Sequence, residues 1–347
     1  QTNSFAGATF VSTINNNPVD YMATGIGFNK DGTQLILGFQ AINKWTNHGQ
    51  GDLGGKDYIR EMDLTTPFDI STATRGERLL IHDSDACGGS FQQPSGGMEF
   101  SSDGKKLFTT NAYGHNTPYD VCQITLSTAY DITSASSYTG IKLNDGDTDV
   151  GLSLNEAQGL AFNEDGTKMF VGHNDSESGT LGDYPAWLFE FDLSTGFDVE
   201  TAKYNNVSIN LTTVGVTEVV GIEFSKNGRS LFVADPNQEV IHQISLSKGF
   251  DLSSTFTVEG TFNDVVAVHD SATGVTDATL KDLSFNDDGS KVYITMSRFS
   301  GANPSNNRHS RVHEYDLDCP YGLVRCDPLN DKALMGVIEA QMELSKS

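Results

Sequence analysis

Two glutamates in this 347-residue chain stand at equivalent places in two of five similar segments. Glu99 and Glu223 each precede a repeated phenylalanine, where the other three segments have Gly27, Ala161 and Ser284. A pair of carboxyl groups can act as general acid and base, or as acid and nucleophile, in glycoside hydrolysis. The alternative is that both are solvated or ion-binding carboxylates. Glu99 and Glu223 are therefore the candidate acid–base pair.

A second group of carboxylates, Asp145, Asp147 and Asp149, alternates with other residues in one short segment. Such spacing supplies the oxygen ligands that calcium prefers, and Glu156 is the twelfth residue counted from Asp145. Val150 stands where an EF-hand loop has glycine, and no flanking helices are expected. The sequence predicts calcium here, with a solvated acidic loop as the alternative.

Five segments of one pattern organise the chain, each with an apolar run, a turn and a second apolar run. The turn residues recur at intervals of 72, 62, 62 and 61 residues and are Asp31, Asp103, Asp165, Asn227 and Asp288. Each is followed by glycine, which between alternating apolar runs is a strong hairpin signal. A third strand is expected at 58–64, 121–126, 188–193, 241–246 and 312–317. After the first four of these, a repeated corner such as TTPFDISTA leads into a fourth run, so each unit is a four-stranded antiparallel meander.

Repeated four-stranded units of this length predict an all-β, five-bladed β-propeller, in which radial closure protects the strand edges. The fifth unit lacks a fourth strand of its own, and the N-terminal run 5–13 is expected to supply it and close the ring. The propeller is predicted to span residues 1–318. Residues 319–347 are predicted to form a Cys-bounded loop and a short C-terminal helix.

That C-terminal helix, expected over 331–347, has one apolar stripe formed by Leu334, Val337, Ile338 and Met342. A short helix of this kind is marginal alone in water, so we expect it to mediate self-assembly or anchoring. Simple docking onto the ring is the alternative.

One polar position recurs in every third strand and is occupied by Glu61, Gln123, Glu190, Gln243 and Glu314. Repetition in all five units favours a structural role over catalysis. We expect these side chains to bond the backbone of a neighbouring blade.

The repeats resemble those of a family of secreted propellers of marine bacteria and their phages, in which DGTKMFV and YDLSTPFDISTA recur in tandem. The matching segments are Asp165–Val171, Phe191–Ala202 and Asp63–Ala73. The resemblance covers about residues 5–318 and implies a propeller that serves in adhesion, receptor binding or surface assembly. The segment Val337–Lys346 also resembles the linker that joins such passengers to an outer-membrane autotransporter barrel.

The loops of a meander divide between two faces, because its strands alternate in direction. Asp-Gly turns and repeated corners make one uniform face, while the second-to-third and interblade loops of the other face vary in length. Function usually lies on variable loops of a rigid scaffold, so that face is the predicted binding surface, with unselected loop drift as the alternative. Its candidate contact residues are Trp45, His48, Phe91, His115, His173, Tyr184, Arg298 and His309.

Four cysteines are expected to form two disulfides. Cys87 and Cys122 both fall near the variable face, and Cys319 and Cys326 flank a short step after the last blade. The alternative is free buried thiols. Because the chain opens at Gln1 rather than Met, we expect an exported protein, secreted or at the cell surface.

The charge of the chain restricts its partners. Asp and Glu number 46 against 22 Lys and Arg, a net charge of −24 that repels nucleic acids and anionic lipids. No apolar run approaches the length of a membrane helix. The sequence thus favours a non-catalytic extracellular binding or structural module, in adhesion or surface-layer assembly, with a surface glycan or protein as partner and no required cofactor. A phage receptor-binding or decoration protein and a carbohydrate-active hydrolase are the alternatives.

Overall fold

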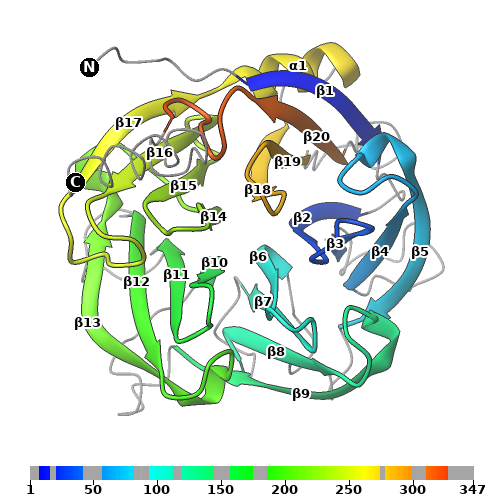
Figure 1. Ribbon diagram of the computed structural model, residues 1–347, viewed down its shortest axis with the longest axis horizontal. Helices are drawn as coiled ribbons and strands as arrows, with labels where there is room; N and C mark the ends of the chain where they lie inside the picture. The colour runs from blue at the N-terminus through cyan, green and yellow to red at the C-terminus, as the bar shows by residue number, and fades with distance from the viewer. Residues whose placement is uncertain are drawn as a thin grey trace, which may run out of the picture.

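Five β-sheets stand around a central axis in the computed structural model, with β2, β6, β10, β14 and β18 nearest the axis (Figure 1). The structure describes residues 8–15, 21–41, 57–81, 87, 94–111, 119–143, 157–174, 186–273, 278–297 and 310–326. Each sheet has four antiparallel strands, and consecutive strands in the chain are neighbours. The predicted five-bladed, all-β propeller is confirmed.

The strands of each blade follow from the axis outward. They are, in blade 1, β2 (Tyr21–Phe28), β3 (Gln34–Ala41), β4 (Tyr58–Leu64) and β5 (Ala73–Leu80); in blade 2, β6 (Pro94–Phe100), β7 (Lys106–Asn111), β8 (Val121–Leu126) and β9 (Ala135–Ile141); in blade 3, β10 (Ala157–Phe162), β11 (Lys168–Asn174), β12 (Ala186–Leu193) and β13 (Ala202–Asn210); in blade 4, β14 (Gly221–Phe224), β15 (Ser230–Asp235), β16 (Val240–Leu246) and β17 (Phe256–Phe262); in blade 5, β18 (Thr279–Phe285), β19 (Lys291–Ser297), β20 (Ser310–Leu317) and β1 (Ala8–Asn15).

The N-terminal strand closes the ring as predicted. β1 pairs antiparallel with β20, from Ala8 opposite Leu317 to Asn15 opposite Arg311. The Ser12 hydroxyl also donates a hydrogen bond of 3.0 Å to Oε2 of Glu314. Blade 5 is therefore built from both ends of the chain.

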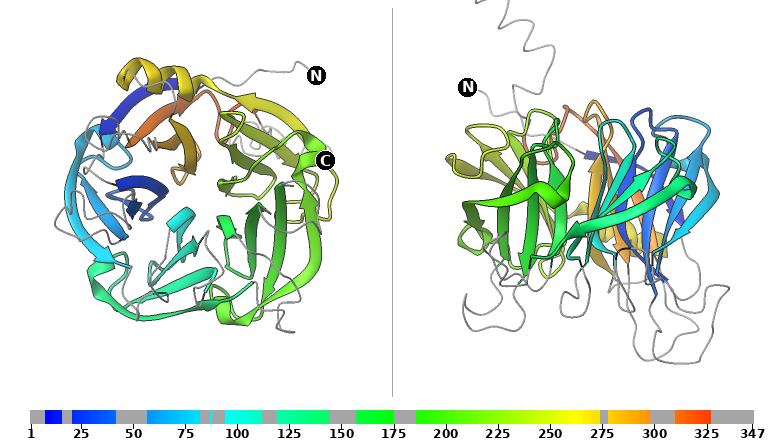
Figure 2. Two further views of the ribbon diagram at one scale, coloured as in Figure 1. Left: turned by 180° about the vertical axis from the view of Figure 1, so that it is seen from behind. Right: turned by 90° about the horizontal axis from the view of Figure 1, so that it is seen from below.

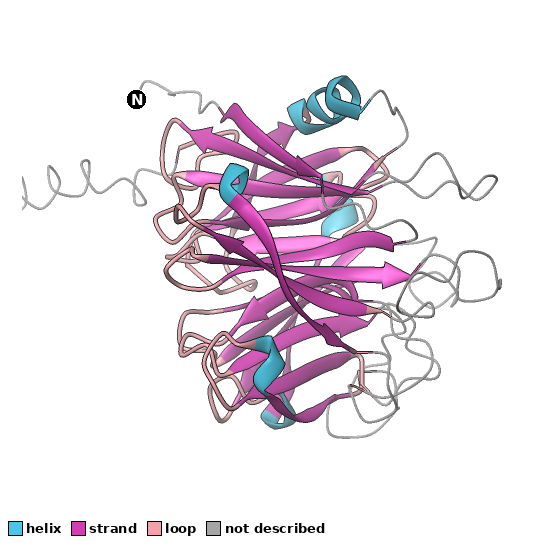
Figure 3. Cartoon of the chain, turned by 90° about the vertical axis from the view of Figure 1, so that its right-hand side faces the viewer, coloured by secondary structure: helices cyan, strands magenta, loops and turns pink. Residues whose placement is uncertain are grey.

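Each tight turn is held by the corner of its own blade. Gly32 has a φ of 71°, and a Cβ on it would lie 2.3 Å from the ring of Phe68. The Phe68 amide donates to the Gly32 carbonyl at 2.9 Å. The other blades repeat this pair as Gly104–Tyr130, Gly166–Phe197, Gly228–Phe250 and Gly289–Tyr321. Turns and corners thus share one end of the ring, called the turn face below (Figure 2, right; Figure 3).

The fifth blade has a corner that the sequence analysis missed. Tyr321 packs on Gly289 as the other corner aromatics pack on their glycines, so the ring continues beyond the predicted boundary at residue 318. In blade 1 the corner is closed by Thr72 Oγ1, which accepts from the Thr66 amide at 3.2 Å. Cys319 stands at the place of Thr66, and its disulfide with Cys326, with Cα atoms 5.8 Å apart, closes the fifth corner.

A belt of five side chains ties each blade to the next, as the sequence analysis expected. Each recurring Glu or Gln of the third strand accepts a hydrogen bond from a corner amide of the following blade. The bonds are Glu61–Ile132 at 3.0 Å, Gln123–Val199 at 3.2 Å, Glu190–Leu252 at 2.9 Å, Gln243–Val324 at 2.7 Å and Glu314–Ile70 at 3.1 Å. The last bond returns to blade 1, so the belt is cyclic.

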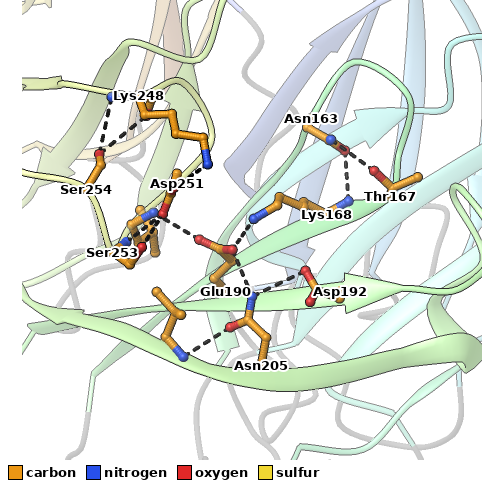
Figure 4. A network of polar contacts seen from close by, with 12 residues as sticks. Asn163, Thr167, Lys168, Glu190, Asp192, Asn205, Lys248, Asp251, Ser253 and Ser254 are labelled. Atoms are coloured by element: carbon orange, nitrogen blue, oxygen red, sulfur yellow. Dashed lines mark hydrogen bonds and ion pairs between the residues drawn. The ribbon is translucent and has the colours of Figure 1, made fainter.

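Two of the three glutamates in the belt form an ion pair with a lysine of the second strand. Glu190 contacts Lys168 and accepts from Asn205 at 2.8 Å (Figure 4). Glu314 lies 2.6 Å from Lys291 Nζ. Glu61 has Gln34 at the corresponding place of the second strand, and it forms no such ion pair with another described residue. Burial and nearby carboxylates raise the pKa of Glu61.

One helix corrects the sequence analysis. The connection between blades 4 and 5 was expected to be one of the variable interblade loops, but it contains α1 (Asp264–Thr273), the one α-helix among the described residues. Val265 is fully buried, and Val266 and Val268 pack against the core of blade 5.

Short 3-10 turns lie at η1 (Ile70–Thr72), η3 (Ile132–Ser134), η4 (Val199–Thr201) and η5 (Leu211–Val214). The predicted C-terminal helix over 331–347 lies outside the described residues. Within the described part of the chain no helix has the length and apolar character needed to cross a bilayer.

Removal of the N-terminal strand tests ring closure. Deleting residues 1–15 leaves β20 as an unpaired edge in blade 5, so we expect aggregation or loss of cooperative unfolding. Calorimetry and size-exclusion chromatography measure both effects, and deletion of residues 1–6 alone is the control. A truncated protein that melts as the full chain does would show that β1 is dispensable.

Replacement of Glu61 tests the belt. Glu61→Gln keeps the acceptor for the Ile132 amide and removes a buried charge, so we expect a melting temperature about 1–2 °C higher at pH 7.5. Because the folded-state pKa is raised, the gain should disappear below pH 4.5, where Glu61 is protonated in both states. Glu314→Gln, which loses the Lys291 pair, should instead lower the melting temperature. Equal effects of the two variants would contradict this account.

Candidate functional site

A cavity of about 330 Å³ lies on the axis at the turn face. All five blades line it through the ends of their inner strands and the turns that follow. This channel-mouth cavity is walled by two aromatic rings from each blade, in pairs whose centroids are 5.0–5.5 Å apart. The pairs are Phe28–Phe68, Phe100–Tyr130, Phe162–Phe197, Phe224–Phe250 and Phe285–Tyr321.

Glu99 and Glu223 line the deep part of this cavity. They are the positions at which Gly27 and Ser284 line it from other blades, so the two carboxyl groups break the repeat. Glu99 Oε2 accepts from the Phe162 amide of the next blade at 2.9 Å. The structure thus brings together the pair that the sequence analysis singled out.

Asp282 lies behind the cavity, on the axis of the ring. It occupies the place where Gly25, Gly97, Gly159 and Gly221 stand in the other blades. Its carboxylate accepts from the Ile26 amide at 3.0 Å and from the Gly97 amide at 3.2 Å, so it links blade 5 to blades 1 and 2.

The glycine at 97 permits a close approach on the axis. Gly97 has a φ of 70°, and a Cβ there would lie 2.4 Å from the Leu160 amide nitrogen of blade 3. Neither Asp282 nor Gly97 lines the cavity, which therefore ends in front of them. The sequence analysis missed Asp282, although a charged residue in place of four glycines is a visible signal.

Burial dominates the electrostatics of these three acids. It raises the pKa of Glu99 to about 8, against a lowering by the Phe162 amide, and it raises the pKa of Asp282 to about 7. The pKa of Glu223 is also raised well above its usual range, first by burial and then by the charges of Glu99 and Asp282. At neutral pH the pair at the floor therefore retains a proton. A protonated carboxyl can donate to a ligand while an ionised one accepts.

The rim of the cavity carries one variable residue from each turn. Lys226 pairs with Asp287 at 3.2 Å, and Lys30, Ser102 and Glu164 complete the rim. The rim charges cancel, so the cavity combines a neutral entrance with an acidic floor.

The sequence analysis predicted eight contact residues on the variable face. Of these eight, only His173 is among the described residues, and it lies in β11 with 1% of its surface exposed and its ring against Phe189. His173 is therefore a buried residue of blade 3 and not an exposed contact. The other seven, Trp45, His48, Phe91, His115, Tyr184, Arg298 and His309, lie outside the described residues.

The predicted cysteine pairs are confirmed. Cys87 is bonded to Cys122, with Cα atoms 5.5 Å apart, and Cys319 to Cys326. The predicted calcium ligands Asp145, Asp147, Asp149 and Glu156 lie outside the described residues. Across the ranges that the structure describes, no three His, Cys, Asp or Glu side chains are grouped to hold a metal ion.

Comparison with known proteins gives distant structural similarity. No protein-family model and no curated protein matches the chain. A luciferin-regenerating enzyme matches at 12% identity, over 88% of this chain and 95% of its own, with a TM-score of 0.41. The periplasmic gluconolactonase PpgL of Pseudomonas aeruginosa matches at 11% identity, over 83% and 70%, with a TM-score of 0.39. A glucose dehydrogenase matches at 13% identity, over 83% and 79%, with a TM-score of 0.41.

The acid pair predicts a pH-dependent stability. Because burial raises the folded-state pKa of Glu99 and Glu223, the folded protein holds protons that the unfolded chain releases. The contribution of this pair to the melting temperature should therefore fall as the pH rises from about 4.5 to about 8. The double variant Glu99→Gln, Glu223→Gln should melt higher than the parent at pH 8.5 and lose part of this slope. An unchanged slope in the double variant would show that the two acids are solvated.

Proposed function

We propose that the channel-mouth cavity binds a neutral, hydroxyl-rich ligand and that the protein is an extracellular glycan-binding module. The observation that carries this proposal is the pair of half-buried carboxyl groups, both with raised pKa values, at the floor of an otherwise repetitive cavity. At about 330 Å³ the cavity is at the small end of ligand pockets, which usually measure roughly 300–1,000 Å³. A unit of one or two sugar rings suits that size.

The chemistry of the floor favours hydroxyl groups. A carboxyl pair that retains a proton at neutral pH offers both donors and acceptors, which matches an alcohol that is both. Aromatic rings from five blades complement the carbon face of a sugar. An anionic ligand is disfavoured, because the floor is acidic and the whole chain carries a net charge of −24.

A structural role would require an acid at the same position in every blade, and the other three blades have none there. Blade 1 has Gly27 at the same position, blade 3 has Ala161 and blade 5 has Ser284. Burying a carboxyl group is unfavourable unless its hydrogen bonds and charge are compensated. Blades 1, 3 and 5 take their places in the ring without a carboxyl group at this position. The two acids of blades 2 and 4 therefore indicate selection for a ligand.

The two disulfides fit an oxidising, extracellular compartment. A glycan-binding propeller there would serve adhesion or surface assembly, and a phage receptor-binding protein would use the same cavity. The variable-loop face stays a predicted second surface for a protein partner.

A carbohydrate-active hydrolase is the second candidate function. One protonated and one ionised carboxyl group can act as general acid and base in cleaving a glycosidic bond. The pKa values of Glu99 and Glu223 are both raised, so either residue can be the proton donor while the other, once ionised, activates water.

Calorimetric titration with neutral di- to tetrasaccharides, chosen from a glycan array, tests binding. We expect the double variant Glu99→Gln, Glu223→Gln to bind its best saccharide at least tenfold more weakly. Glu77→Gln, a change on the exposed outer strand of blade 1, should bind as the parent does. Array silence, or equal affinity in all three proteins, would overturn the proposal.

Release of reducing ends from the bound saccharide separates the binder from the hydrolase. A hydrolase should lose at least 100-fold in turnover with Glu99→Gln, the usual scale for loss of a general acid. A binder should show no turnover in the parent while its affinity still depends on the acid pair.

A further inference from the structure

Blade 1 contains a pair of acids whose counterparts in other blades bind a lysine of the same blade. Glu61 and Asp63 are two residues apart on β4, so both lie on one face of the strand. Glu61 is 6% exposed, while Asp63 is exposed. One Glu61 oxygen accepts from the Ile132 amide, and the other has no hydrogen-bond partner in the part of the chain that the structure describes. Neither acid forms an ion pair within that part.

Blade 5 shows how these two positions act when the lysine is present. Lys291 of β19 stands opposite Asp316 of β20. Its Nζ lies 2.6 Å from Oε1 of Glu314 and 2.7 Å from Oδ1 of Asp316. Glu314 and Asp316 correspond to Glu61 and Asp63, so the two positions together bind one primary ammonium group.

Blade 3 supplies two donors at the same place (Figure 4). Lys168 contacts Glu190. Asn205 Nδ2 donates to Oε1 of Glu190 at 2.8 Å and to Oδ1 of Asp192 at 3.2 Å. A lysine and an asparagine thus serve the acids of this blade.

Both donors are replaced in blade 1. Gln34 stands opposite Asp63, in the place of the lysine. Gly76 lies in the bulge of β5, in the place of Asn205. A Cβ on Gly76 would lie 3.1 Å from Oδ2 of Asp63 and 3.2 Å from Cβ of Glu61, so the glycine leaves space beside both acids.

The two acids occur together in the repeat. Blades 3 and 5 have both acids and a lysine that contacts them. Blades 2 and 4 have a neutral residue at both positions, namely Gln123 with Thr125 and Gln243 with Ser245. Blade 1 retains both acids without the lysine. Because glutamine serves the belt in blades 2 and 4, the belt does not explain the acids of blade 1.

The electrostatics of this place favour a cation. Burial raises the pKa of Glu61, and the charges of Asp131, Asp63 and Glu77 raise it further, against a lowering by the Ile132 amide. A positive charge here would therefore be attracted by four carboxylates.

The arginines of blade 1 do not supply that charge. Arg60 and Met62 alternate with the two acids, so they lie on the other face of β4. Arg78 and Arg75 stand opposite them on β5. Arg60 donates instead to the Gly76 carbonyl at 3.3 Å.

We propose that Glu61 and Asp63 bind a lysine side chain of a partner protein, whose ammonium group takes the place that Lys291 Nζ has in blade 5. The exposed Asp63 lies at the entrance and the buried Glu61 at the inner end, which suits an ammonium group on a slender alkyl chain. A basic partner also suits a chain with a net charge of −24. Neither acid lines the channel-mouth cavity, so this site is separate from it.

Butylammonium reproduces the side chain of lysine and is the probe. At low salt we expect it to shift the carboxyl ¹³C resonance of Glu61 in the full chain saturably and to lower the pKa of that carboxyl group. Tetramethylammonium at the same ionic strength should give no saturable shift, because it has no hydrogen to donate to a carboxylate.

Variants of blade 1 locate the binding. Gln34→Lys installs the lysine of blades 3 and 5, so it should raise the melting temperature and weaken butylammonium binding at least about tenfold. Asp63→Asn changes an exposed residue, and it should weaken binding even if Gln34→Lys does not fold. The matched control Asp192→Asn removes the corresponding exposed acid of blade 3 and should bind as the parent does.

Four results would overturn the proposal. They are no saturable shift in the parent, equal responses to the two ammonium ions, unchanged binding in the blade 1 variants, and saturation by calcium but not by butylammonium. Tighter binding of glucosamine than of butylammonium would favour an amino sugar and contradict a protein partner.

Discussion

The belt of five hydrogen bonds between third strands and neighbouring corners is the constraint on which the ring depends. Each blade can accept only one corner at one place, because a Glu or Gln oxygen must meet a buried amide of the next blade. Charge is not required for this role, since Gln123 and Gln243 perform it as well as the glutamates. Where the acceptor is charged, Lys168 or Lys291 neutralises it, and Glu61 is the exception.

The belt also determines what happens at the axis. Once the blades are held at a fixed inclination, their inner strands converge, and glycine at four of five equivalent positions permits the approach. The fifth position holds Asp282, whose carboxylate accepts hydrogen bonds from backbone amides of blades 1 and 2. The axis is thereby filled on one side, and the space left on the other side is the channel-mouth cavity. The site is a consequence of how a ring of five closes.

The sequence predicted the repeated elements and the closure of the ring, and it missed the fifth corner and α1, which do not match the repeat. Turns, strands, corners and the belt recur at near-constant intervals, so each was visible five times. The fifth corner was missed because Gly322 and a disulfide replace the repeated Asp and the closing hydroxyl. α1 was missed because it has no sister segment. Glu99 and Glu223 were found as departures from the repeat. Their meeting in a cavity at the turn face depends on the convergence of the inner strands, and the variability of the loops carries no information about that convergence.

Departures from the repeat divide into two kinds according to their partners. Three departures lie in blade 5, where one open chain closes into a ring. They are the Cys319–Cys326 disulfide, β1 and Asp282, and each replaces a contact that the other blades make differently. Glu99 accepts one hydrogen bond from an amide of the next blade. At the position of Glu223, blades 1, 3 and 5 have residues without a carboxyl group. Burial raises the pKa of both, and closure gains little from them. In a molecule where structural needs are met five times over, the acids that no blade requires are the ones that we propose to bind a ligand.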